Sequence, residues 1–168
     1  DSLLVLLGSM NKTVGAGPVA RGIRQLQVFF KNELAFKDDD LTLFDGSGLN
    51  TKNRVSAEKI VEVLSLVARK PLLFPYFLVS LPTPGGYGSL KDRFSEASEK
   101  KLIVQAKTGT LTAPITVSGL AGYLYMDKGW VAFALLFNGK SDAKQPSLVE
   151  AKKLQERLVR HVYQTAQK

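Results

Sequence analysis

A lysine, a glycine and two threonines stand together directly after an apolar run of the chain. The stretch reads VQAKTGTLTAP, and it places Lys107, Thr108, Gly109 and Thr110 in direct succession. The amine and the two hydroxyl groups are suited to binding a carboxylate, and the absent side chain of Gly109 lets a substrate backbone approach closely. The N–H of Thr110 is a candidate for one arm of an oxyanion hole. These residue types predict a site for the carboxylate end of a peptide.

The elements around this stretch predict an antiparallel sheet covered by helices. A strand over Leu102–Ala106 delivers Lys107, and two further strands, Gly119–Met126 and Trp130–Asn138, are joined by a tight turn at residues 127–129. If the first strand lies at an edge of the sheet, its unpaired backbone groups can accept a peptide as an added strand. A helix closes the chain, marked by apolar residues at helical spacing: Leu148, Ala151, Leu154, Leu158 and Val162.

The residues before the sheet are predicted to be mainly helical. Helices are expected at Ser2–Leu7 and Val19–Phe36, and a short strand at Leu41–Phe44. A further helix is capped by Ser56 and ends near Lys70, and the segment FPYFLVSLP favours another short helix. With the sheet, these elements make an α/β fold, and no internal repeat or linker divides residues 1–168.

Composition narrows the possible functions. The chain has 168 residues, 45% of them hydrophobic, which is ordinary for a globular protein. Its net charge is +8, but the basic residues are scattered, so we expect a solvated basic surface and no nucleic-acid partner. Cysteine is absent and there is one histidine, which argues against disulfides, thiolate metal sites and histidine-based clusters. No apolar segment is long enough to span a membrane.

Four motifs together resemble one family. The segments DGSGLNTKNRVS, GGYGSLKDRF, AKTGTL and LAGYL occur in the order, and near the spacing, of the class C low-molecular-mass penicillin-binding proteins, the D-alanyl-D-alanine carboxypeptidase/endopeptidases. The K-T-G segment of that family corresponds to Lys107, Thr108 and Gly109. In the family it lines the active site on an edge strand and grips the substrate carboxylate, in agreement with the interpretation from the residues themselves. One departure is the connection TAPITVS, which is a few residues longer than usual.

The resemblance implies a fold and a function. The fold would be α/β, an antiparallel sheet with packed helices, as in penicillin-binding transpeptidases and serine β-lactamases. Residues 1–168 would form the C-terminal part of such a domain in a serine-type D-Ala-D-Ala carboxypeptidase, with endopeptidase activity left open. The implied partners are peptidoglycan stem peptides, with β-lactams as inhibitors of the complete enzyme. Neither a metal nor an organic cofactor is implied, and the expected location is periplasmic or otherwise extracytoplasmic.

The nucleophile motif of this family, S-x-x-K, has no convincing counterpart in the chain. The pattern occurs at Ser56–Lys59, at Ser98–Lys101 and at Ser141–Lys144. The first serine is better explained as a helix cap, and the other two lie in polar segments beside the sheet. We therefore expect the chain to lack the acylated serine.

The second family motif, S-x-N, leaves two alignments open. Ser9-Met10-Asn11 fits its letters. By spacing, however, the first helix corresponds to the helix that follows the motif in relatives. On this alignment Asp1 is the middle residue of S-x-N, and Ser2 stands where asparagine is expected. The second alignment is favoured.

Three further features have structural and functional interpretations. Asp45, in the turn-rich DGSG segment, is expected to be scaffold, with its carboxylate bound to nearby amides. Asn53 and Arg54 are expected to anchor the same loop. Tyr87, between two glycines, either packs its own loop, which is favoured, or borders the substrate cleft. A second function remains open for the whole chain: a non-catalytic binding or assembly module with the same fold.

Overall fold

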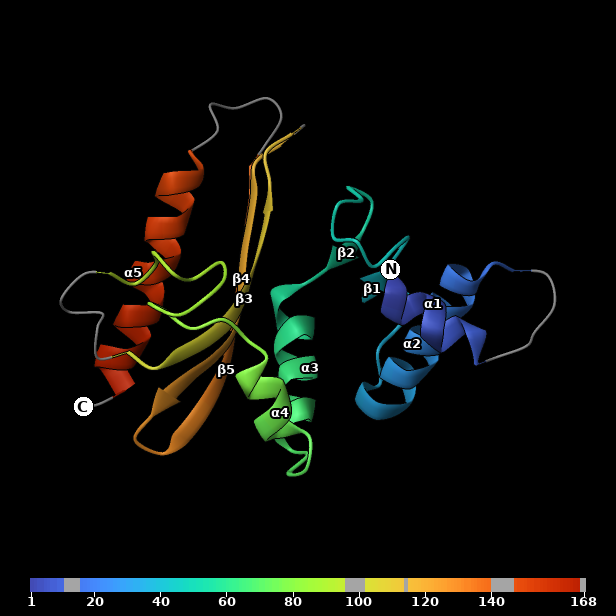
Figure 1. Cartoon of the computed structure of the whole chain (residues 1–168), viewed down its shortest axis with the longest axis horizontal. Coiled ribbons are helices and arrows are strands. Elements are labelled where there is room, and N and C mark those ends of the chain that lie inside the picture. The colour runs from blue at the N-terminus through green and yellow to red at the C-terminus, as the bar shows by residue number, and fades with distance from the viewer. Residues whose placement is uncertain (11–15, 96–101, 114, 140–146, 167–168) are drawn as a thin grey trace. The chain divides into compact units, whose positions relative to one another are not determined.

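The computed structural model describes residues 1–10, 16–95, 102–113, 115–139 and 147–166 (Figure 1). The chain forms two compact units, Asp1–Lys59 and Ile60–Lys168. Their boundary lies within helix α3 (Ala57–Ala68). Among the described residues, no helix combines the length and the apolar character needed to cross a membrane.

The first unit is built on two helices that approach each other closely. They are α1 (Ser2–Ser9) and α2 (Pro18–Leu34), and α2 begins with proline in its first turn, where the missing N–H costs nothing. A Cβ on Gly8 would lie 1.8 Å from the Pro18 carbonyl oxygen, and one on Gly22 would lie 2.1 Å from the Leu4 carbonyl oxygen. Glycine at these two positions therefore lets the helix backbones touch.

A small two-stranded sheet and a polar loop complete this unit. Strands β1 (Leu41–Thr42) and β2 (Arg54–Val55) pair antiparallel, so the predicted strand at Leu41–Phe44 is present but two residues shorter. The shortening has a local cause: the N–H of Phe44 binds the side-chain oxygen of Asn53 at 2.8 Å rather than a strand partner.

The second unit is centred on a three-stranded antiparallel sheet with the strand order β3-β4-β5. Its strands are β3 (Val104–Leu111), β4 (Val117–Met126) and β5 (Gly129–Asn138). The predicted β4–β5 hairpin is confirmed, although Gly129 opens β5 instead of closing the turn. Its φ of +115° is a conformation that glycine adopts without strain.

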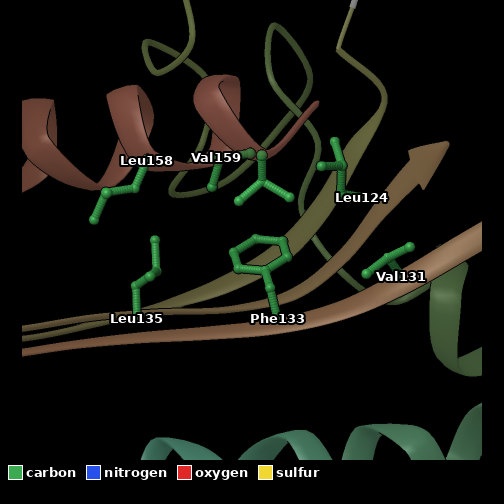
Figure 2. A pocket seen from close by; sticks show the side chains of 7 residues that line it. Leu124, Val131, Phe133, Leu135, Leu158 and Val159 are labelled. Carbon is green, nitrogen blue, oxygen red and sulfur yellow. The ribbon is translucent and has the colours of Figure 1, made fainter. Parts of the chain in front are cut away.

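Helix α5 (Leu148–Ala166) covers one face of this sheet. It is the predicted C-terminal helix, and its buried residues are Ala151, Gln155 and Val159. Figure 2 shows Phe133 and Leu135 of β5 pointing toward α5 across an apolar gap. The core on this side consists of Leu90, Phe94, Leu102, Val104, Ala106, Leu120, Leu124, Met126 and Val159.

The opposite face of the sheet carries α3 and the short helix α4 (Phe74–Val79). Tyr123 of β4 is fully buried there and donates a hydrogen bond from its hydroxyl group to the Leu64 carbonyl oxygen at 2.8 Å. Its ring also meets Phe74 edge-on, with centroids 5.1 Å apart. Burial raises the pKa of Tyr123 to about 12. This single side chain links the helical layer to the central strand.

The strand that carries the lysine differs from its predicted bounds. We expected Leu102–Ala106 followed by an irregular end, but β3 starts at Val104 and runs on to Leu111. Residues 107–111 pair in unbroken register with residues 117–121 of β4. Pairing with a neighbouring strand therefore overrides the low strand propensity of lysine and glycine.

Candidate active-site strand

Strand β3 is an edge of the three-stranded sheet, as predicted. Backbone groups of a strand alternate between its two sides, and here Ala106 points its N–H away from β4, toward the Pro82 carbonyl oxygen at 3.0 Å. Thr108 and Thr110 share that outward orientation. No backbone group in the described part of the chain pairs with their outward N–H groups. The strand thus offers an open edge at the two threonines.

Lys107 is exposed on the sheet face opposite α5, because its neighbour Ala106 is buried in the core on the α5 side. Its ammonium group donates a hydrogen bond to the Thr108 carbonyl oxygen at 2.6 Å. Within the described residues no carboxylate pairs with this ammonium group. The ammonium group therefore lies beside the open edge and is available to an anionic ligand.

Gly109 keeps the same stretch of strand uncovered. A Cβ built on it would have no heavy atom within 4 Å. Opposite it in β4 stands Gly119, so two glycines face each other across the ladder. Both Gly109 and Thr110 are exposed, and Thr108 is half-buried. The four predicted site residues thus share one accessible strand, and none of the described side chains fills the space at Gly109.

One neighbour of this edge was not anticipated from the sequence. Pro82 lies in the loop between α4 and β3, and its carbonyl oxygen accepts a hydrogen bond from the outward N–H of Ala106. The only sequence signal was the PTPGG composition, which indicates a turn but not what the turn contacts. The open edge is therefore bounded at the Ala106 end.

A buried polar network supports the sheet from the α5 side. The Gln155 side-chain amide donates to the Ser118 carbonyl oxygen at 2.9 Å, and Ser118 is the β4 partner of Thr110. Arg93 contacts the Gln155 side-chain oxygen at 3.2 Å and forms an ion pair with Glu156 at 2.5 Å. The network joins Arg93, in the loop before β3, to α5 and to Ser118 of β4. Ser118 lies opposite Thr110, whose N–H is the candidate oxyanion donor.

The serine of the first S-x-x-K match has a structural role. The hydroxyl oxygen of Ser56 accepts the N–H of Lys59 at 3.1 Å, which confirms that it caps α3. Lys59 in turn pairs with Asp40 at 3.4 Å and lies over the Phe36 ring. The backbone N–H of Lys37, and then Lys59, lower the pKa of Asp40. The other two matches, at 98–101 and 141–144, lie outside the described residues.

The S-x-N alternatives are only partly visible. Ser9 lies in the last turn of α1, where its hydroxyl group donates to the Val5 carbonyl oxygen at 2.7 Å, while Asn11 lies outside the described residues. The Asp1 carboxylate accepts the N–H of Gly46 at 2.7 Å. The residue that the second alignment makes the middle of the motif therefore joins the start of the chain to the polar loop that contains Gly46.

The predicted scaffold role of Asp45 is confirmed. Its carboxylate accepts the N–H of Ser47 and the side-chain amide of Asn53, each at 3.2 Å. Partial desolvation works to raise the pKa of Asp45, but these hydrogen bonds outweigh it and the pKa is lowered. Asn53 also binds the Phe44 N–H, so it is the loop anchor that was predicted.

The favoured interpretation of Tyr87 is wrong. Its side chain is 98% exposed and packs nothing. The loop is closed by backbone hydrogen bonds instead, from Gly86 to Thr83 and from Lys91 to Gly88, and therefore needs no aromatic side chain to hold it.

The described part of the chain has no cluster of side chains suited to binding a metal ion. No group of three or more histidine, cysteine, aspartate or glutamate side chains is positioned there to hold an ion. The site therefore consists of an ammonium group, hydroxyl groups and outward backbone groups. This set can bind a peptide carboxylate and polarise a carbonyl group.

The chain is similar in sequence to known proteins. A D-alanyl-D-alanine carboxypeptidase from an Actinomadura species is 32% identical over 135 residues, which cover 77% of this chain and 24% of the relative. The chain thus spans about a quarter of the length of that relative.

Solved structures share the fold. Penicillin-binding protein 4 of Haemophilus influenzae, complexed with a β-lactam, has a TM-score of 0.77 at 24% identity and covers 97% of this chain and 37% of its own. A representative class A β-lactamase from Bacteroides cellulosilyticus has a TM-score of 0.58 at 17% identity, over 86% of this chain and 54% of its own. The predicted penicillin-binding and serine β-lactamase-like α/β fold is confirmed.

The family assignment follows from the sequence match. Residues 13–158 match the D-Ala-D-Ala carboxypeptidase 3 (S13) family, and the match includes all four motifs and the lysine-bearing strand. The resemblance inferred from the motifs is thereby confirmed, and the chain belongs to the D-Ala-D-Ala carboxypeptidase 3 (S13) family.

Proposed function

We propose that residues 1–168 are the peptide-binding part of a serine-type D-Ala-D-Ala carboxypeptidase that acts on peptidoglycan stem peptides. The observation that carries this proposal is the exposed ammonium group of Lys107, with which no described carboxylate pairs, beside an open strand edge at Thr108 and Thr110. A substrate of this kind places the protein outside the cytoplasm, in the periplasm or at the cell wall.

In the proposed complex, the stem peptide adds to β3 as a further strand. Its terminal carboxylate binds the Lys107 ammonium group and the Thr108 hydroxyl group, and the oxygen of the scissile carbonyl accepts the N–H of Thr110. The open space at Gly109 admits the peptide backbone. In this arrangement the lysine is catalytic because it also stabilises negative charge that develops at the carbonyl, and the other three residues bind substrate.

The reaction that fits this arrangement proceeds through an acyl-enzyme. A serine hydroxyl attacks the carbonyl of the penultimate D-alanine, its proton passes to the departing nitrogen, and the terminal D-alanine leaves as an amine. Water then hydrolyses the ester and restores the serine. Of the three S-x-x-K matches, Ser56 caps α3, and Ser98 and Ser141 stand in polar sequence beside the sheet, so we propose that the nucleophile lies outside residues 1–168.

Substitution of the lysine tests the proposal, in a protein that joins these residues to the rest of the family domain. Lys107→Ala should slow acylation by a labelled β-lactam by about 10²–10³-fold, because one electrostatic contact to the transition state is worth roughly 2.7–4 kcal/mol. Lys107→Arg should rescue poorly, since the planar guanidinium group is not equivalent to the ammonium group. Lys128→Ala, at the exposed β4–β5 turn, is the matched control. Wild-type acylation by Lys107→Ala would contradict the assigned role.

The isolated chain gives a second test. Residues 1–168 alone should form no covalent adduct with a β-lactam, as judged by intact mass. An adduct on any serine of the chain would overturn the placement of the nucleophile. If the longer protein also forms no adduct but still binds a D-Ala-D-Ala peptide through Lys107, the alternative of a non-catalytic binding module is correct.

A further inference from the structure

We infer that Gln155 is a positioning residue for the proposed reaction, and that Arg93 fixes the orientation of its side-chain amide. Gln155 holds the backbone of β4 at Ser118, and through β4 it holds the N–H of Thr110 where the scissile carbonyl oxygen must bind. The inference deepens the proposed function and rests on it, because it takes Thr110 as the oxyanion donor. Gln155 itself has no contact with substrate in this arrangement.

Gln155 is a polar side chain in an apolar layer. It lies on α5 one turn from both Ala151 and Val159, and its exposed fraction is 3%. A buried amide is costly unless its donor and its acceptor are both paired. Here the nitrogen donates to the Ser118 carbonyl oxygen at 2.9 Å, and the oxygen accepts a hydrogen bond from the Arg93 guanidinium group at 3.2 Å. An aliphatic residue would serve packing alone, so the amide indicates a need for the contact with β4.

Arg93 leaves the amide of Gln155 one orientation. A guanidinium group can only donate hydrogen bonds, so the Gln155 oxygen must face Arg93 and the nitrogen must face Ser118. Arg93 also donates to the Lys152 carbonyl oxygen at 3.0 Å and to the Glu156 carboxylate at 2.5 Å. Its three partners share one face of α5, which fixes the guanidinium group against that helix.

The backbone next to Arg93 adopts a rare conformation that favours this contact. Phe94 has a φ of +57°, in the left-handed region that bulky residues seldom occupy. Its side chain is buried in the core, while the side chain of Arg93 reaches α5. Strain of this kind persists where the surrounding structure holds it in place. The turn thus directs two consecutive side chains inward, and one of them is the arginine that orients Gln155.

Ser118 lies between the ladder pairs that hold Thr110. Because Thr110 directs its N–H outward, it forms a non-hydrogen-bonded pair with Ser118, its partner in β4. The hydrogen-bonded pairs are the neighbours on either side, Gly109 with Gly119 and Leu111 with Val117. A shift of the β4 backbone at Ser118 therefore moves the partners on both sides, and Thr110 moves with them.

This end of the ladder has little other support. Gly109 faces Gly119, so no cross-strand pair of side chains stabilises it. The strand ends one residue beyond Thr110, at Leu111, and the ends of ladders open readily. Gly109 leaves room for the peptide backbone, and the buried contact at Ser118 supplies from the α5 side the support that this glycine does not.

Gln155→Met in the longer protein described above tests the inference. Methionine is close to glutamine in length and volume but removes the amide donor and acceptor. The rate constant of acylation by a β-lactam should fall about 10–100-fold, the range expected when a reacting group is displaced by up to about 1 Å. The dissociation constant of the complex that precedes acylation should change little, because Lys107 and Thr108 still bind the carboxylate.

The acyl-enzyme reports directly on the oxyanion donor. An ester carbonyl group that accepts a weaker hydrogen bond absorbs at higher wavenumber in the infrared, so its band should shift upward in Gln155→Met. Val159→Ala is the matched control, because it removes buried methyl groups one turn along the same helix and leaves the polar network intact. It should lower Tm without changing the acylation rate constant or the band at a temperature where the variant is folded.

Two results would overturn the inference while the proposed function stands. One is a wild-type acylation rate and an unshifted band in Gln155→Met. The other is an equal loss in Gln155→Met and Val159→Ala, since general destabilisation would then be sufficient. If the wild type forms no adduct, or if Lys107→Ala is acylated as fast as the wild type, the proposed function has failed and the inference fails with it.

Amide hydrogen exchange on the wild-type protein decides the matter if Gln155→Met does not fold. The N–H groups of Gly109 and Leu111 should be as well protected as that of Lys107, although they lie at the end of the strand. Rapid exchange at both positions would show that the contact at Ser118 does not hold this end of β3, and would overturn the inference.

Discussion

Gly122 of β4 is the position where a single methyl group should do most damage to the candidate site. A Cβ there would lie 2.1 Å from the Gln105 carbonyl oxygen and 2.5 Å from the Cα atom of Ala106. Both are backbone atoms of β3, directly before Lys107. To relieve the contact, β3 must move away from β4 by about 0.9 Å, the difference between 2.1 Å and the shortest tolerated separation of 3.0 Å.

The expected cost follows from this geometry. Overpacking of a tight core costs about 1–3 kcal/mol, and a clash with backbone lies at the upper end because no rotamer relieves it. Replacing glycine by alanine inside a strand otherwise stabilises by roughly 0.5–1 kcal/mol. The net loss for Gly122→Ala is therefore about 2 kcal/mol, which for a chain of this size lowers Tm by roughly 4–8 °C. Displacement of β3 should also slow acylation in the longer protein.

Gly119→Ala is the matched control on the same strand. Its added methyl group would come no closer than 3.5 Å to any atom, and that atom is the mobile end of the Leu136 side chain. We expect Gly119→Ala to melt at or slightly above the wild-type temperature. Thermal and urea melts followed by circular dichroism compare the two variants. If both melt together, the close approach of β3 and β4 at Gly122 is not what limits this position.

Three further predictions concern contacts that hold the second unit together. Tyr123→Phe should cost about 1–3 kcal/mol, because the Leu64 carbonyl oxygen loses its buried donor. Since the pKa of Tyr123 is raised by burial to about 12, its stabilising effect is complete below pH 10 and is lost as the pH rises toward 12; alkaline melts should show a decline that the variant lacks. Ser147→Ala should cost about 1 kcal/mol of stability by removing the N-cap of α5. Hydrogen bonds from Ser147 lower the pKa of Glu150, so the stability advantage of the wild type over this variant should shrink as the pH falls below the usual carboxyl range. Arg93→Ala should destabilise the protein by about 3–5 kcal/mol, because it leaves the partly buried Glu156 carboxylate on α5 without its ion-pair partner. A urea unfolding midpoint equal to that of the wild type would refute this prediction.

Local patterns were sufficient to predict the type and order of most elements. The hairpin of β4 and β5 follows from two alternating apolar runs around a short turn, and α5 follows from apolar spacing along the helix. The order of the elements permitted an edge position for the K-T-G segment and the family resemblance implied it, and β3 is an edge strand. Ser56 as a cap and Asp45 as scaffold were also predicted, because hydrogen bonds between residues two or three apart depend on local sequence alone.

Long-range pairing decided the features that the sequence left open. The bounds of β3 depend on which residues of β4 lie opposite it, and that register continues through Thr110 to Leu111. The exposure of Tyr87 depends on a loop that closes through its own backbone. The partners of Arg93 lie about sixty residues away on α5, and no local pattern could predict that contact.

For the site itself, residue types determined the chemistry and tertiary structure determined the access. A lysine, two hydroxyl groups and a glycine indicate a carboxylate site wherever they stand on an exposed strand. Whether the strand edge is open, and for how many residues, depends on which backbone groups reach it from elsewhere in the chain. At Ala106 that group is the carbonyl oxygen of Pro82, twenty-four residues earlier, and at Thr108 and Thr110 the described chain supplies none. A backbone carbonyl carries no side-chain signature, so its position could come only from the folded structure.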